Sequence, residues 1–456
     1  MNPHGMAYVQ GKAVSILGVA RSGMAAAALL SRHGANVFVS EYGTISEEKK
    51  RELSNLGVAW EDGGHTAKAV DSDFVVVSPG VPSASPPMVS AMKSKTPIFS
   101  EIEVASWFCN APIIAITGSN GKTTTTELMG HIFKKSGRTT WVCGNVGTPF
   151  SGICDQCEPA DIIILEVSSF QLDHIDQFKP TVSVLLNITP DHLDRYEYVF
   201  ERYAESKMRI CENQRADCAV VFNVDDTYLR ERMRKAALNG PEQFTISING
   251  PVDKGGYFDR DTLFIATDRQ SEKIMYVDEL ALRGRHNVYN SLAAAVAARV
   301  MEVRSDVVRE SLRTFAGVPH RLETIREVDG VRYINDSKAT NVNAVWFALE
   351  SFSEPVVLIA GGRDKGNDYS SLKPLITSRV RALITIGEAA EKMHEELGPC
   401  VPDCVAAESL EDAVKLAQLL AKPGDVVLLS PACASFDMFD SYEHRGDLFK
   451  QAVSNL

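Results

Sequence analysis

Short apolar runs rich in β-branched residues alternate along the chain with longer segments whose apolar residues recur at helical spacing. This alternation is typical of βαβ units, in which helices connect and cover parallel strands. With no tandem repeat and no low-complexity tract, the pattern predicts an α/β protein. Strands are expected at 13–17, 36–40, 74–77, 113–117, 140–142, 161–167, 182–187, 219–223, 331–335, 356–360, 382–386 and 426–430, and helices at 24–33, from 122 onward and at 286–301.

The pattern falls into three blocks. Between residues 240 and 280 the segments become short and alternating, with Gly and Asp between them, which indicates β-hairpins. A last run of alternating strands and helices begins after the Gly-Val-Pro at 317–319. We therefore predict three domains, at residues 1–100, 101–317 and 318–456, with ligand clefts between them.

Composition narrows the class of protein. The 456 residues are 45% hydrophobic and 23% charged, which excludes wholesale disorder. The 59 acidic and 47 basic residues give a net charge of −12, so general affinity for nucleic acid or anionic membranes is not expected. No apolar run approaches the ~20 residues that span a bilayer, and the amino-terminal residues have no signal-peptide core. We expect a cytoplasmic protein.

The nine cysteines are scattered. Cys154 and Cys157 form a single CxxC, and Cys400 and Cys404 form a looser pair, but neither has a second ligand pair nearby. Zinc is therefore not expected, and reduced thiols are the simpler interpretation.

The stretch TGSNGKTTT at 117–125 follows a predicted buried strand and opens a predicted helix. Glycines allow backbone N–H groups to approach phosphate oxygens, and the helix N-terminus adds partial positive charge. A lysine here can bridge the β- and γ-phosphates of a nucleotide, and the following hydroxyl can bind Mg²⁺. The general P-loop has a further glycine where this chain has Ile116, so the loop is a shorter variant. The candidate ATP residues of this loop are Gly118, Ser119, Asn120, Gly121, Lys122, Thr123 and Thr124.

Further candidates follow the next strands. Glu166 ends a predicted buried strand, where a carboxylate is well placed to bind Mg²⁺ in a ligand cleft. His192 lies in the polar loop after another strand, and its alternative role is a loop-stabilising hydrogen bond to Asp191 or Asp194. Taken alone, Lys207 on its predicted helix would face solvent.

The segments TGSNGKTTT, EVSSFQL, NITPDHLDR and YxxxK occur here in the order found in the Mur ligases, and the chain resembles that family of amide-forming enzymes of peptidoglycan precursor synthesis. Folylpolyglutamate synthetases share the first loop. The resemblance implies ATP, two Mg²⁺ ions and a CO₂-derived carbamate on Lys207. It also implies a Rossmann-like first domain, a central P-loop-type ATPase domain with a mainly parallel sheet, and a Rossmann-like α/β third domain. The implied catalytic residues are Lys122, His192, Lys207 and Arg321, and the implied metal ligands are Thr123, Glu166, His192 and Lys207.

The last block carries further family motifs. The resemblance implies that Asn287 contacts adenine, that Arg321 in PHRLE reaches the phosphates, and that Asp336 in NDSKATN binds the ribose. It places Lys338 near the phosphates, and domain closure over ATP would then exclude water. An Asx turn with a surface lysine is the alternative for residues 336–338.

Two segments resemble the D-glutamate-adding members of the family: GVARSG with SPGVP in the first block, and SPACAS at 430–435. The DNPR segment of the diaminopimelate-adding members is absent, and Tyr442 stands where the D-glutamate-adding members often have Phe. The implied UDP-sugar residues are Gly18, Ala20, Arg21, Ser22, Glu41, Gly80, Asn145, Ser168, Gln171 and His192. The implied D-glutamate residues are Thr340, Lys365, Ser435 and Tyr442.

The resemblance thus implies an ATP-dependent ligase that adds D-glutamate to UDP-N-acetylmuramoyl-L-alanine through an acyl phosphate. Another amide ligase, such as a folylpolyglutamate synthetase, is the nearest alternative. An NAD-dependent oxidoreductase would rest on the first block alone, where Ala20 replaces the middle glycine of GxGxxG. A P-loop motor or switch would have no use for the amino-acid residues. We expect small-molecule partners only and a monomer, and leave open the group that accepts the amine proton, Asp191 or another carboxylate.

Overall fold

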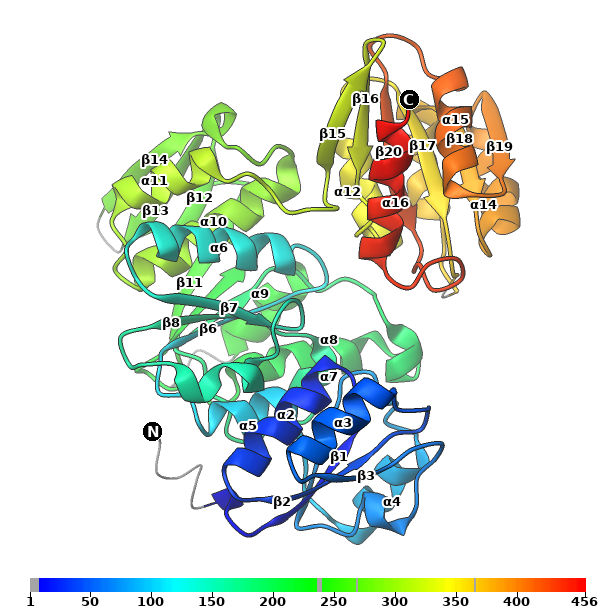
Figure 1. The fold of residues 1–456 in the computed structure, drawn as a ribbon. Coiled ribbons are helices and arrows are strands. Elements are labelled where there is room, and N and C mark those ends of the chain that lie inside the picture. The colour runs from blue at the N-terminus through cyan, green and yellow to red at the C-terminus, as the bar shows by residue number, and fades with distance from the viewer. Residues whose placement is uncertain (1–7, 236–239, 268–269, 365) are drawn as a thin grey trace. The chain divides into compact units, whose positions relative to one another are not determined.

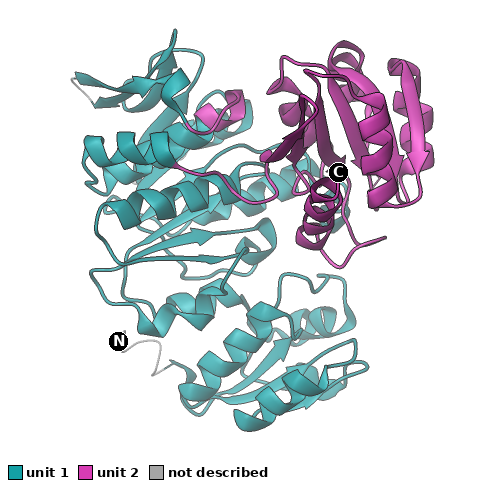
Figure 2. Cartoon of the chain, turned by 45° about the horizontal axis from the view of Figure 1, so that its top comes forward, with its two compact units in different colours: residues 1–280, 289–314 teal, residues 281–288, 315–456 magenta. Residues whose placement is uncertain are grey.

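The computed structural model describes residues 8–235, 240–267, 270–364 and 366–456. Its contacts group the chain into two compact units (Figure 2). Unit 1 comprises Met1–Leu280 and Tyr289–Thr314, and unit 2 comprises Ala281–Val288 and Phe315–Leu456. Each unit is an α/β structure, as the alternating pattern predicts.

The first sheet of unit 1 has five parallel strands in the order β3-β2-β1-β4-β5. The apolar strand β4 (FVVV) is wholly buried in it, as expected for a strand covered on both faces. This order is the doubly wound arrangement, and the predicted Rossmann-like first domain is confirmed. The elements are β1 (Ala13–Leu17), α2 (Arg21–Arg32), β2 (Asn36–Ser40), α3 (Glu47–Asn55), β3 (Ala59–Glu61), β4 (Phe74–Val77), α4 (Pro86–Ser94), β5 (Ile98–Ser100) and α5 (Glu101–Ser106).

The second sheet of unit 1 has nine strands in the order β14-β13-β12-β11-β10-β9-β6-β8-β7. It is parallel from β7 to β12, and the two antiparallel pairs lie at its β14 edge (Figure 1). A mainly parallel central sheet with hairpins near residue 260 is therefore confirmed. Its elements are β6 (Ile113–Thr117), α6 (Lys122–Lys135), β7 (Thr140–Gly144), β8 (Ile162–Glu166), α7 (Ser169–Leu172), β9 (Val182–Leu185), α8 (Phe200–Met208), β10 (Ala219–Asn223), α9 (Thr227–Lys235), β11 (Glu242–Ser247), β12 (Gly255–Asp259), β13 (Thr262–Thr267), β14 (Gln270–Tyr276), α10 (Arg285–Val300) and α11 (Ser305–Thr314).

Unit 2 contains a six-stranded sheet in the order β15-β16-β20-β17-β18-β19, in which only the β15 edge is antiparallel. Apolar side chains from successive positions of β17 and β20 enter separate clusters on the two faces, so helices cover both. The elements are β15 (Glu323–Val328), β16 (Val331–Asn335), α12 (Val342–Glu350), β17 (Val356–Gly361), α13 (Lys373–Arg379), β18 (Val380–Ile386), α14 (Ala390–Leu397), β19 (Asp403–Ala407), α15 (Leu410–Leu420), β20 (Val426–Ala432) and α16 (Tyr442–Ser454).

Some predicted bounds were wrong. Helix α2 begins at Arg21 instead of residue 24, because Ala20 already has the extended backbone of an N-cap. Strand β9 ends at Leu185 instead of residue 187, which frees Asn187 for side-chain bonds described below. The three-domain boundaries stay a prediction. The nine cysteines all lie in the described ranges and are free thiols. No helix in these ranges is both long and apolar enough to span a membrane.

Candidate active site

The loop of residues 118–121 joins β6 to α6. Gly118 and Gly121 have φ values of +154° and +88°, in the region that favours glycine. A Cβ at Gly121 would lie 2.4 Å from Asn290 Oδ1, so a larger residue cannot fit without displacing that side chain. Thr123 and Thr124 are buried in the first turn of α6. Gly121 and the first turn of α6 therefore bring a glycine turn and a helix N-terminus to one place, which suits an anion.

Side chains from outside the loop fix its shape. Asn187 Oδ1 accepts the Asn120 backbone N–H at 2.9 Å, and Asn187 Nδ2 donates to the Asn120 carbonyl at 3.0 Å. Ser119 Oγ donates to the Thr189 carbonyl at 2.8 Å and accepts the Thr189 N–H at 2.9 Å. It also shares a hydrogen bond of 2.8 Å with Tyr203 Oη. Sequence reasoning missed the roles of Asn187, Thr189 and Tyr203, although all three lie inside motifs that it had noted.

Two lysines converge on this loop. Lys122 Nζ donates to the carbonyls of Gly118 and Ser119 at 2.7 and 3.0 Å. Lys207 Nζ, from α8, donates to the same Gly118 carbonyl at 2.9 Å. Lys207 is only 2% exposed. Burial, with a smaller contribution from the Lys122 charge, holds the pKa of Lys207 well below its usual range. The solvent-facing interpretation of this lysine is therefore wrong.

Glu166 lies at the same edge of the sheet, since it pairs with Ile116 two residues before the loop. Its Oε1 accepts from Asn145 Nδ2 at 3.0 Å. Its Oε2 is buried and has no hydrogen-bond partner. An unpaired buried carboxylate oxygen fits a hard cation, and a threonine hydroxyl at 123 is a second oxygen donor of the kind Mg²⁺ prefers.

The described residues do not complete a metal site by themselves. Within the described ranges, no group of three or more His, Cys, Asp or Glu side chains is arranged to hold a metal ion. Mg²⁺ commonly takes one or two protein oxygens and completes its shell with phosphate and water. The residues present therefore fit Mg²⁺ held together with a nucleotide.

His192 has a left-handed backbone, with φ of 51°. Its Nε2 lies 3.7 Å from Asp191 Oδ2, and its ring packs edge-on against Phe170 at a centroid distance of 5.2 Å. The ring distance is longer than a hydrogen bond, and it is the His192 backbone N–H that donates to Asp191 Oδ1, at 3.0 Å. Ser168 caps α7, because its N–H and hydroxyl both donate to Gln171 Oε1 at 3.0 Å.

In the first sheet, the candidate residues follow the carboxyl ends of β1, β2 and β4. Glu41 accepts the N–H groups of Val19 and Gly43, both at 2.9 Å, and so ties the turns after β1 and β2 together. Gly18 lies in the first turn with φ of +92°. Ala20 is the N-cap of α2. The remaining candidates are Arg21, which donates to the Gly147 carbonyl at 3.2 Å, Ser22 beside it, and Gly80 after β4.

In unit 2, Asp336 follows β16 and is buried. It accepts from the Leu322 N–H at 3.2 Å and from Ser430 Oγ at 2.8 Å. Burial raises the pKa of Asp336 to about 6, although the nearby Arg321 charge opposes that rise. Arg321 Nε is buried without a hydrogen-bond partner. Lys338 Nζ donates to Tyr442 Oη at 3.2 Å and lies over the ring.

Sequence reasoning missed Arg445, on α16. Only 1% exposed, it donates through Nε to Ser337 Oγ at 2.9 Å and through NH2 to the Ser337 carbonyl at 2.8 Å. Both NH groups also donate to the Cys433 carbonyl, at 3.2 and 3.3 Å. Arg445 therefore joins the loop that holds Thr340 to the loop that holds Ser435.

The other predicted residues of unit 2 are placed as follows. Asn287 Nδ2 donates to the Arg283 carbonyl at 2.7 Å in the first turn of α10. Ser435 is buried, and Tyr442 begins α16. Lys365 lies outside the described residues.

Three protein-family models match the chain. The MurD N-terminal domain model matches residues 13–86, the Mur ligase middle domain model matches 116–298, and the Mur ligase glutamate ligase domain model matches 320–433.

Similar proteins extend over nearly the whole chain. The UDP-N-acetylmuramoylalanine–D-glutamate ligase of Salinibacter ruber is 55% identical over 97% of both chains. The same-named ligase of Christiangramia forsetii is 43% identical, over 98% of this chain and all of its own. Among solved structures, a pseudomurein peptide ligase type C from Methanothermus fervidus has a TM-score of 0.61 at 20% identity, covering 98% of this chain and 100% of its own. The UDP-N-acetylmuramate–alanine ligase MurC from Thermotoga maritima has a TM-score of 0.59 at 20% identity, covering 97% and 99%. These two structures support the fold.

Proposed function

The chain belongs to the Mur ligase family, and from this premise we propose that it is the ATP-dependent ligase that joins D-glutamate to UDP-N-acetylmuramoyl-L-alanine in peptidoglycan precursor synthesis. The observation that carries this function is 55% identity to a ligase of that name over 97% of both chains. The MurD-type first domain separates it from other amide ligases. The family resemblance expected from the motifs is confirmed, and the oxidoreductase and motor alternatives have no support.

The chemistry forms an amide in two steps. The carboxylate of the L-alanyl group attacks the γ-phosphorus of ATP, and ADP leaves. The D-glutamate amine then attacks the carbonyl carbon of the acyl phosphate, phosphate leaves, and the amine loses a proton. Lys122 and Arg321 offset the negative charge that develops on the transferred phosphoryl group.

The family uses ATP with Mg²⁺, which supplies charge neutralisation and orientation when bound. Thr123 and Glu166 would hold one ion, and His192 and Lys207 would contribute to a second. The unpaired Glu166 Oε2 supports the first assignment.

We also propose that Lys207 carries a carbamate. Burial lowers its pKa and so favours the neutral amine, which can attack the carbon of CO₂ and release a proton to give an anionic oxygen donor. A carbamate signal in the ¹³C NMR spectrum of the protein in ¹³C-bicarbonate, absent from Lys207→Ala, is the expected result. Lost activity in Lys207→Ala that short carboxylic acids do not rescue would count against it.

The remaining assignments are proposals that rest on the family motifs. We propose that the nucleotide sugar binds at the turns after β1, β2 and β4 and at Asn145, Ser168, Gln171 and His192. We propose that Asn287, Arg321, Asp336 and Lys338 bind ATP, and that Thr340, Lys365, Ser435 and Tyr442 bind D-glutamate. A three-domain division near residues 100 and 317, a monomer and a cytoplasmic location belong to the same proposal.

Phosphate release tests the function. The purified chain is given ATP and Mg²⁺ with UDP-N-acetylmuramoyl-L-alanine and D-glutamate, and each substrate is then omitted in turn. Release should require both, and the product should show the mass of the amide. A folate substrate with glutamate serves as the matched control for the rival ligase. Phosphate release that ignores the nucleotide sugar and D-glutamate would overturn the assignment.

A further inference from the structure

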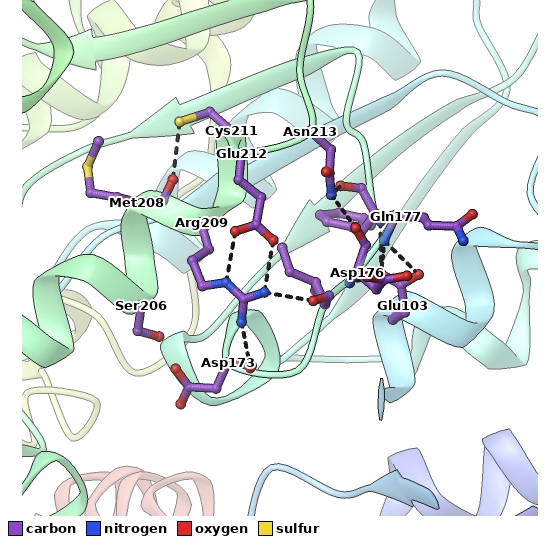
Figure 3. Close-up of polar contacts among 12 residues, drawn as sticks. Glu103, Asp173, Asp176, Gln177, Ser206, Met208, Arg209, Cys211, Glu212 and Asn213 are labelled. Atoms are coloured by element: carbon purple, nitrogen blue, oxygen red, sulfur yellow. Dashed lines mark hydrogen bonds and ion pairs between the residues drawn. The ribbon is translucent and has the colours of Figure 1, made fainter. Parts of the chain in front are cut away.

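The segment of residues 173–178, between α7 and β9, has no helix or strand of its own. We call it the 173–178 loop. Side chains satisfy most of its backbone groups from two sides (Figure 3). On one side, the buried Glu103 of α5 accepts three successive N–H groups, from Asp176 at 2.9 Å, Gln177 at 3.0 Å and Phe178 at 2.8 Å.

The carbonyl groups of the loop are bound from the other side. Arg209 donates through NH1 to the Asp173 carbonyl at 2.5 Å and through NH2 to the Ile175 carbonyl at 2.7 Å. Asn213 Nδ2 donates to the carbonyls of Asp176 at 2.8 Å and Phe178 at 3.2 Å. Both donors belong to the segment that directly follows α8, so this segment holds the carbonyl side of the loop.

The same end of α8 contacts the proposed active site. Ser206 Oγ donates to the Ser169 carbonyl of α7 at 2.8 Å. Lys207 Nζ donates at 2.9 Å to the Gly118 carbonyl in the loop of residues 118–121, which we call the phosphate loop. Within four residues, α8 and its end therefore bind α7, the phosphate loop and the 173–178 loop. Helix α7 carries Gln171 and begins after Ser168, the two buried residues proposed to bind the nucleotide sugar.

We propose that Arg209 is a positioning residue for the ligase reaction: it fixes α7, and thereby Ser168 and Gln171, relative to Lys207 on α8. This inference rests on the proposed function of the site. The guanidinium of Arg209 binds both the Asp173 and the Ile175 carbonyl. It also donates to the Glu212 carboxylate through two hydrogen bonds of 2.9 Å, which fix its orientation. A lysine has one ammonium group and no planar fork, so it cannot reproduce this set of bonds.

The surroundings of Arg209 allow a direct chemical test. Its side chain lines an open pocket of about 430 Å³, together with Asp173, Tyr196 and Ser206. Truncation at Cβ leaves room that solvent can reach. A small guanidinium ion can then take the place of the lost group between the Asp173 and Ile175 carbonyls.

The experiment compares full-length wild type, Arg209→Ala and Arg209→Lys in the phosphate-release assay. We expect Arg209→Ala to raise KM for the nucleotide sugar tenfold or more and Arg209→Lys to raise it less. KM for ATP should stay within twofold, because Asn187 and Thr189, which lie outside α8, hold the phosphate loop without Arg209. Ethylguanidinium should restore the KM of Arg209→Ala, and ethylammonium at the same concentration should not.

Arg215→Ala removes an exposed arginine from the same segment and is the matched control, with wild-type constants expected. An unchanged KM for the nucleotide sugar, or equal rises for both substrates without rescue, would reduce Arg209 to a structural role. If Arg209→Ala does not fold, a wild-type KM in Arg209→Lys overturns the proposal and a raised one supports it. A wild type that releases no phosphate in response to D-glutamate refutes the proposed function instead, so the two failures are distinguishable.

Discussion

The phosphate loop of unit 1 and two loops of unit 2, those after β16 and after β20, are held in place by different kinds of side chain. They lie at carboxyl ends of parallel strands, where backbone groups leave the sheet without ladder partners. In unit 1, hydrogen bonds of the neutral side chains of Asn187, Ser119 and Tyr203 hold the loop. In unit 2, the single buried cation of Arg445 holds the Ser337 and Cys433 carbonyls together.

The two kinds of side chain differ in the charge that they place beside each loop. Neutral holding groups in unit 1 add no charge to a loop at which Lys122, a donor to the carbonyls of Gly118 and Ser119, is proposed to meet the phosphates of ATP. In unit 2, burial lowers the pKa of Arg445 to about 10, which still leaves it charged at neutral pH. Support that is shared among several side chains should fail gradually, whereas loss of Arg445 removes four hydrogen bonds of unit 2 at once.

Arg445→Met removes the hydrogen bonds that this one side chain makes in unit 2, and it should have the largest effect on stability. Each buried carbonyl left without a donor costs the folded state about 1–3 kcal/mol, so we expect the free energy of unfolding of unit 2 to fall by about 3–5 kcal/mol. Native-state hydrogen exchange of the β16 and β20 amides measures it, and KM for D-glutamate should rise in parallel. Arg326→Met removes an exposed arginine of β15 and is the control. Loss of less than about 1 kcal/mol at position 445 would remove the contrast between the units.

Asp336→Asn should raise the stability of unit 2, whereas Arg445→Met lowers it. The pKa of Asp336 is raised from 3.8 to about 6, so the folded state binds more protons than the unfolded state between these values. Wild-type stability therefore falls as pH rises through that window. The variant should gain about 1–3 kcal/mol on wild type between pH 4 and pH 8, while its KM for ATP rises.

Denaturation of both proteins across pH 4–8 measures this gain. Asp403→Asn, at an exposed position of β19, should show no such dependence. A stability difference that is flat with pH would mean that the carboxyl group of Asp336 is not destabilised by burial.

Asn187→Ala removes one of the several side chains that hold the phosphate loop, and it should have the smallest effect on stability. It removes two hydrogen bonds to Asn120, but Ser119 still holds the loop, so a loss of about 1–2 kcal/mol is expected. KM for ATP should rise about five- to thirtyfold, which corresponds to that loss. Asn223→Ala removes a similar bond at the end of the neighbouring strand β10 and should leave KM for ATP unchanged. Complete loss of ATP binding in Asn187→Ala would show that support in unit 1 is concentrated too.

Sequence reasoning succeeded where local pattern suffices. The run IIAIT before a glycine loop predicts β6 and the anion site, because burial and φ preference are properties of those residues themselves. It missed β3 (AWE) and β5 (IFS), which have three residues each and are strands because β2 and β4 pair with them. It also took Lys207 as solvent-facing when read alone, since nothing in YAESK shows that α8 lies against the phosphate loop.

The sequence by itself determined the alternation of strands and helices, the anion-binding loop and the family, because each is encoded in contiguous residues. The tertiary structure decided which side chains share an environment: the burial of Lys207, the unpaired oxygen of Glu166, and the bonds of Arg209 and Arg445. Hydrogen bonds and desolvation act between residues that are distant along the chain and adjacent in space, so only the folded arrangement sets the chemistry of these groups.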